Sequence, residues 1–105
     1  MDGVFIKDVR RYLGNPALLE QCAEECAELA QACLKMSRKI RGENPTPKTM
    51  QEVTCDLNEE IADVMLCVNT LVEAGIISNE SVESVIMQKE ERWVKRLLEK
   101  GESNE

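Results

Sequence analysis

Apolar residues recur at helical spacing in two segments of the chain, and the second segment repeats the first 35 residues later. Within each segment the steps are four and three residues, the spacing of one face of an α-helix. The matching sets are Cys22, Cys26, Leu29, Cys33 and Met36, and Leu57, Ile61, Val64, Val68 and Leu71. A repeat of five heptads indicates two helices with equivalent apolar stripes, which can pack antiparallel about a local twofold axis.

Glycine, proline and capping residues divide the chain into four predicted helices. Asn15 followed by Pro16 suits the start of the second helix, since proline needs no partner for its nitrogen at the first helical position. Residues 49–52, Thr-Met-Gln-Glu, are a capping box for the third helix, and Ser78 or Asn79 caps the fourth. The predicted helices span residues 4–13, 16–41, 49–74 and 80–100.

These elements predict an all-α fold in a single domain of residues 1–105, with a frayed tail at 102–105. The chain has only one Phe, one Tyr and one Trp, and its aliphatic content favours interdigitating helices over a sheet. The loop 42–48, with two prolines and a glycine, makes an antiparallel helical hairpin of the two long helices. The last long helix is expected to pack on this hairpin. Because a domain of this size buries little core alone, we expect a homodimer or homotetramer with a four-helix-bundle-like arrangement.

Matching acids flank the two apolar stripes. At about 100° per residue, Glu25 and Glu60 lie roughly 60° from the centre of their stripes. Glu28 and Asp63 lie roughly 120° from those centres on the same side. Acids on ordinary solvated helix faces, which are the alternative interpretation, have no reason to match in this way. Antiparallel packing would bring the four carboxylates together, and neighbouring anions repel strongly unless cations hold them.

Oxygen ligands of this kind favour a hard divalent cation. The chain has no histidine, and carboxylates alone select Mg²⁺, Mn²⁺ or Ca²⁺. A di-iron bundle needs Glu-x-x-His pairs and does not fit. Cys22 and Cys26 do not make a zinc site, because no second pair completes four ligands. We therefore predict Mg²⁺, with Mn²⁺ as the alternative, since Mg²⁺ bridges protein carboxylates to phosphates.

Two basic groups stand out in this acidic chain. The first, in the last predicted helix, consists of Lys89, Arg92, Lys95 and Arg96. It fits either ordinary ion pairs along a helix surface or an edge that faces phosphate. The second, at the end of the second predicted helix, consists of Lys35, Arg38, Lys39 and Arg41. It suits the negative end of the helix dipole, and it could equally border an anion site.

Charge and cysteine content narrow the class of protein. The net charge of −7 argues against a protein that binds nucleic-acid polymers through a basic face. No run of about 18 apolar residues is present, so we expect no membrane-spanning helix. The first residues lack the order of a signal peptide. The five cysteines form an odd set without a CxxC pair, which favours reduced thiols in a cytoplasmic protein.

The paired acidic motif resembles the signature of the MazG-type all-α nucleotide pyrophosphohydrolases. Segments 24–32, EECAELAQA, and 59–65, EEIADVM, are similar to the usual wording of that family. Lys89 and Arg92, followed by Trp93, resemble the Lys-x-x-Arg-aromatic run of its last helix. The resemblance covers about residues 18–98, although the gap between the two acidic segments is slightly longer than is common in the family.

The resemblance implies hydrolysis of a nucleoside triphosphate between the α and β phosphates, giving a nucleoside monophosphate and pyrophosphate. It also implies a dimer or tetramer with active sites near the subunit interfaces. The implied residues are Glu25, Glu28, Glu60 and Asp63 as metal ligands, Glu24 and Glu59 as catalytic residues that orient the attacking water or support the ligands, and Lys89 and Arg92 as phosphate-binding residues.

Two other functions fit the same residues. One is a non-catalytic helical module that binds a divalent metal and oligomerises. The other is a hydrolase of the same fold that acts on phosphoribosyl-ATP or a modified nucleotide. Pyrophosphate release from a panel of triphosphates separates the first from an enzyme, and the substrates that respond identify the second.

Overall fold

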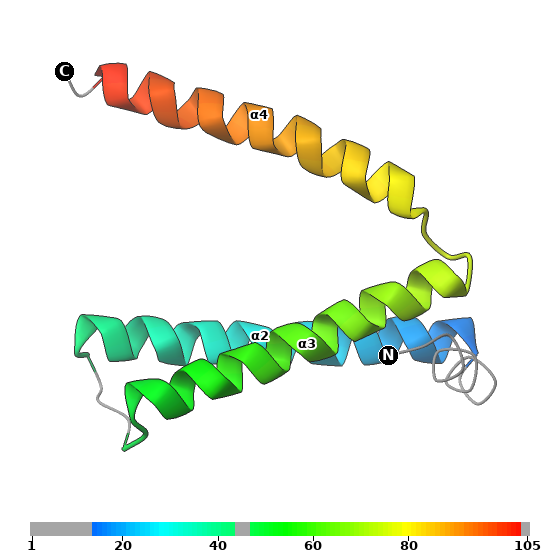
Figure 1. The fold of residues 1–105 in the computed structure, drawn as a ribbon, viewed down its shortest axis with the longest axis horizontal. Coiled ribbons are helices and arrows are strands. Elements are labelled where there is room, and N and C mark those ends of the chain that lie inside the picture. Colours follow the sequence, from blue (N-terminus) through cyan, green and yellow to red (C-terminus); the bar gives the residue numbers. More distant parts are fainter. Residues whose placement is uncertain (1–13, 44–46, 104–105) are drawn as a thin grey trace.

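The computed structural model describes residues 14–43 and 47–103, which form three helices (Figure 1). They are α2 (Asn15–Arg41), α3 (Met50–Glu73) and α4 (Asn79–Ser103). No strand occurs within the described ranges, so the predicted all-helical fold is confirmed. The predicted helix 4–13 lies outside them. None of the three helices has both the length and the apolar content that crossing a bilayer requires.

Local hydrogen bonds fix the ends of the hairpin helices as predicted. The Glu52 N–H donates to Thr49 Oγ1 at 3.1 Å, and the Thr49 N–H donates to Glu52 Oε1 at 3.0 Å, which completes the capping box. Gly42 ends α2 with a φ of 72°, and Gly75 follows α3 with a φ of 74°. This left-handed conformation strains other residues, so glycine stops both helices.

Two helix boundaries differ from the prediction. Gly14, and not Asn15, is the N-cap of α2, because the Gly14 carbonyl already accepts the first helical bond, from the Leu18 N–H at 3.0 Å. At the other end of the chain, α4 continues through Gly101 to Ser103, past the predicted end at residue 100. Gly101 does not adopt a positive φ there, so the backbone does not turn out of the helix.

The seam between α2 and α3 is the centre of the fold. The two helices run antiparallel and pack on each other, which confirms the predicted hairpin (Figure 1). Buried and half-buried positions recur in steps of four and three on both helices: Leu18, Cys22, Glu25, Leu29, Ala32 and Met36 on α2, and Val53, Leu57, Glu60, Val64, Cys67 and Leu71 on α3. Each position on α2 has its equivalent 35 residues later on α3. The seam is therefore built on a local twofold repeat.

This seam lies to one side of the apolar stripes that the sequence predicts. The outer residues of those stripes are exposed, namely Cys26, Cys33, Ile61 and Val68. Glu25 and Glu60, predicted beside the stripes, occupy seam positions instead. Two helices bury only a narrow row of side chains between them. The small residues Ala32 and Cys67 let the helices approach along the row that holds the acids, and the wider apolar stripe is left uncovered.

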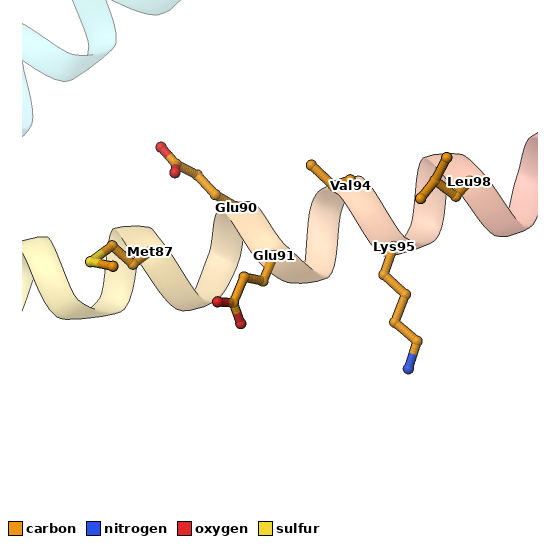
Figure 2. Close-up of a pocket in the computed structure, with 6 residues that line it drawn as sticks. All are labelled: Met87, Glu90, Glu91, Val94, Lys95 and Leu98. Carbon is orange, nitrogen blue, oxygen red and sulfur yellow. The ribbon is translucent and has the colours of Figure 1, made fainter.

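The last helix does not pack on the hairpin, in contrast to the prediction. Figure 1 shows α4 leaving the end of α3 and diverging from both hairpin helices. Its large apolar side chains are exposed, with Trp93 at 68% and Leu98 at 64%. In Figure 2, Val94 and Leu98 project from one side of α4 together with Glu90. An amphipathic helix needs an apolar surface to cover it, and the hairpin of the same chain does not supply one here.

Candidate metal centre

Four carboxylates meet midway along the seam. Glu25 and Glu28 come from α2, and Glu60 and Asp63 come from α3, with one oxygen from each residue all within 4.8 Å of one another. Glu25 and Glu60 are half-buried in the seam, while Glu28 and Asp63 are exposed beside it. The predicted convergence of both acidic pairs on one site is therefore confirmed.

Two oxygens of this cluster lack a hydrogen-bond partner. Glu25 Oε2 and Glu60 Oε2 are both buried without one. A buried carboxylate oxygen is destabilising unless a donor or a cation compensates for the lost water. A hard divalent cation binds oxygen ligands. The cluster offers only oxygens, and two of them lack another partner and belong to side chains in the packed seam. The residues therefore fit Mg²⁺ or Mn²⁺.

Gln21 orients one of the two seam carboxylates. Its Nε2 donates to Glu25 Oε1 at 2.8 Å. This bond lowers the pKa of Glu25, but partial burial and the charges of Glu28 and Asp63 outweigh it, so the pKa of Glu25 is raised above its ordinary value. Gln21 was not among the residues predicted from the sequence. Its position four residues before Glu25, on the same helix face, was the available signal.

Two thiols lie in the seam next to the acids. Cys22 of α2 forms a side-chain hydrogen bond with Cys67 of α3. Burial raises the pKa of Cys67 to about 12, with further contributions from Cys22, Glu25 and Asp63. The Cys67 thiol is thus protonated at neutral pH and adds no further negative charge next to the carboxylates. It fills the seam as a small apolar group.

The chain matches a known protein family over the segment that builds this site. The model of the MazG nucleotide pyrophosphohydrolase domain matches residues 14–97, which include the whole hairpin and most of α4. This chain belongs to the MazG family. Comparisons with curated proteins and with solved structures gave no match. The family assignment supports a nucleotide pyrophosphohydrolase as the general class of activity.

The predicted catalytic residues of this MazG domain lie next to the cluster but not within it. Glu24 and Glu59 each precede a seam carboxylate and are exposed. At about 100° per residue, each points away from the seam ligand that follows it. The cluster of four oxygens includes neither residue. Their catalytic role stays a prediction.

The predicted phosphate-binding residues of the MazG domain lie on α4. Lys89 and Arg92 line a hollow of about 290 Å³ together with Trp93 and Arg96. The structure therefore gathers the basic residues around the aromatic ring. It does not bring them to the carboxylates, because α4 diverges from the hairpin (Figure 1).

A groove adjoins the carboxylate cluster between α2 and α3. It has a volume of about 400 Å³ and is lined by Glu28, Gln31, Ala32, Lys35, Lys48, Asp56 and Glu60. Within it, Lys48 Nζ pairs with Asp56 Oδ2 at 2.6 Å. The hydrogen bond with Asp56 and then the charge of that carboxylate raise the pKa of Lys48. This pair was not predicted from the sequence, although Asp56 lies one helical turn before Glu60.

Proposed function

We propose that this MazG domain is a metal-dependent nucleoside triphosphate pyrophosphohydrolase. It would cleave its substrate between the α and β phosphates to give a nucleoside monophosphate and pyrophosphate. The family supports the class of reaction. The metal dependence is supported by one observation above all: four carboxylates share a site in which two buried oxygens have no partner.

The ligands of the cation would be Glu25, Glu28, Glu60 and Asp63. When bound, Mg²⁺ or Mn²⁺ supplies positive charge that offsets the phosphates and makes a water molecule more acidic. Glu25 and Glu60 offer oxygens whose positions the seam fixes, and Gln21 leaves the Oε2 of Glu25 free for the cation. Glu28 and Asp63 are exposed and can adjust to it.

Residues outside the cluster would orient the reactants. We propose that Glu24 and Glu59 accept hydrogen bonds from the attacking water, or hold the ligands that follow them. Lys89 and Arg92 would donate to phosphate oxygens as charge-assisted partners. Their place on α4 requires that this helix cover a hairpin, either its own or that of a second copy.

A homodimer or homotetramer would provide that cover. The exposed stripe residues of the hairpin and the apolar residues of α4 are both surfaces that a single chain leaves open to water. Contiguous apolar surfaces of this kind are typical of interfaces. We therefore propose that copies of the chain pack through them in a bundle of helices. The net charge of −7 does not suit a nucleic-acid polymer as partner.

The test is pyrophosphate release from a panel of ribo- and deoxynucleoside triphosphates with Mg²⁺ or Mn²⁺. Glu60→Gln is compared with Glu20→Gln, which removes an exposed carboxylate of α2 outside the cluster. Loss of a ligand should lower turnover by about 100-fold or more, because ligand and metal positioning supply much of the catalytic effect. The Glu20 variant should match the wild type. No release from any triphosphate, or equal release by Glu60→Gln, would favour a non-catalytic module.

A further inference from the structure

The groove beside the carboxylate cluster changes from acidic to basic along its length. Glu28 and Glu60 belong to both the cluster and the groove, and Lys35 and Lys48 line the same groove. Lys35 follows Glu28 by seven residues, which places it about 10 Å further along α2. Lys48 directly precedes the capping box of α3. Because the two helices are antiparallel, both lysines lie toward the loop end of the hairpin.

Lys35 is available to a ligand. It is exposed, and among residues 14–43 and 47–103 its side chain has no hydrogen bond or ion pair. Lys35 and Glu28 line the same groove, and side chains on a helix lean toward its N-terminus, so the ammonium group of Lys35 can reach toward the cluster. Lys39, one turn further along α2, is not among the residues that line the groove. The structure thus separates Lys35 from the rest of the basic run at the end of α2.

Lys48 adds a second ammonium group at the same end of the groove. Its ion pair with Asp56 fixes the ammonium group at the start of α3. The N-terminus of a helix also carries a partial positive charge. Asp56 partly cancels this charge, since its carboxylate lies in the groove as well. The basic character of the groove therefore depends most on Lys35.

We infer that the basic end of this groove binds the β and γ phosphates, the part of the substrate that leaves as pyrophosphate. The inference rests on the proposed pyrophosphohydrolase function. With the α phosphate at the carboxylate cluster, the two terminal phosphates must extend to one side of it. Toward the loop end they gain charge-assisted hydrogen bonds from Lys35 and the positive charge of Lys48. Lys35 is the binding residue that determines this direction.

Binding of inorganic pyrophosphate to the full chain in the presence of Mg²⁺ tests the inference, with isothermal titration calorimetry as the measurement. Lys35→Gln should weaken binding about tenfold or more, as expected for a lost hydrogen bond to a charged group. Lys39→Gln is the matched control, with the same change of charge one turn away. It should shift binding about twofold at most, because Lys39 does not line the groove and its charge acts from further away through screening solvent. Lys35→Arg should restore most of the affinity. Binding of a nucleoside monophosphate should not change in Lys35→Gln.

Asp56→Asn gives an independent test in the opposite direction. It removes the negative charge that offsets Lys48, so pyrophosphate should bind more tightly than to the wild type. Circular dichroism confirms that each variant is folded.

Three results would overturn the inference: a wild type that does not bind pyrophosphate, equal losses in Lys35→Gln and Lys39→Gln, or weaker binding by Asp56→Asn. Turnover is measured separately. Binding that depends on Lys35 without any pyrophosphate release supports the groove as a diphosphate site and contradicts the proposed reaction instead.

Discussion

The α2–α3 hairpin and α4 are built from amphipathic helices of similar length, 24 to 27 residues, but they differ in what covers them. In the hairpin, each seam residue on α2 has an equivalent on α3, so the two apolar rows fit each other. The sequence of α4 has no such counterpart in the described part of the chain, and its apolar side chains face solvent. A pair of matched helices thus completes a site within one chain, whereas an unmatched helix needs a second surface.

Charged substitutions on α4 should have the largest effect of all, on the assembly of the chain. Leu98→Glu and Val94→Glu place carboxylates on the side of α4 that Figure 2 shows open. If α4 is covered in the oligomer, a buried unpaired charge should dissociate it to monomers while the hairpin stays folded. Light scattering at micromolar concentration measures the oligomeric state, and circular dichroism measures the helix content. Lys95→Glu, on the other side of α4, is the control. A wild type that is already monomeric would contradict the prediction.

Truncation of a seam residue should have the next largest effect. Leu18 is 4% exposed, so Leu18→Ala should lower the free energy of unfolding by about 2–4 kcal/mol through lost burial and a cavity. Leu19, its neighbour at 48% exposure, is the matched control, and Leu19→Ala should cost less than about 1 kcal/mol. Urea denaturation measures both. Equal losses would mean that the seam is not the core of the fold.

Removal of one cluster carboxylate should stabilise the metal-free protein. Glu60→Gln leaves three anions where four repel one another, so its melting temperature without divalent metal should rise above that of the wild type. Added Mg²⁺ should raise the melting temperature of the wild type more than that of the variant, because a ligand of the folded state is lost. Differential scanning calorimetry with and without Mg²⁺ measures both shifts. A lower melting temperature in the metal-free variant would show that Glu60 supports the fold rather than a cation.

The smallest expected effect concerns the capping box of α3. Hydrogen bonds from Thr49 lower the pKa of Glu52 below its ordinary value of 4.5, so the ionised carboxylate stabilises the folded state. This contribution is present above pH 4.5 and is lost as the pH falls through the lowered pKa. Glu52→Ala should therefore lower the melting temperature slightly at neutral pH, and the difference should shrink in acid. A difference that does not depend on pH would assign the effect to helix packing instead.

The sequence was sufficient to predict the hairpin and the convergence of its carboxylates, because both depend on local spacing. Caps such as Thr49 and stops such as Gly42 act within a few residues. The repeat of 35 residues makes positions on the two helices equivalent, whichever row of side chains packs between them. The exact row that packs was not predictable in this way. It depends on how closely two helices approach, and small side chains such as Ala32 decide that only in three dimensions.

The position of α4 and the lysine groove escaped the sequence analysis for a related reason. Amphipathicity predicts that a helix face will be covered, but it does not identify which surface covers it. Lys48 pairs with Asp56 because it directly precedes the N-cap of α3 and its long side chain reaches the second turn of that helix. Lys35 belongs to the same groove only because the helices are antiparallel. These features depend on contacts between segments whose order along the chain carries no periodic signal.

The twofold repeat of the hairpin also has a consequence for the direction of a bound molecule. A symmetric pair of helices would accept a linear ligand in either of two opposite orientations. Here the residues at equivalent positions of the two helices differ. Lys35 corresponds to Thr70, whose hydroxyl donates to the Leu66 carbonyl. Asp56 corresponds to Gln21, whose amide donates to Glu25. The loop end of the hairpin therefore has the exposed charge of Lys35, whereas the equivalent position at the other end has a neutral hydroxyl that is already hydrogen-bonded. A nucleotide, which is charged at one end alone, would enter such a site in a single orientation.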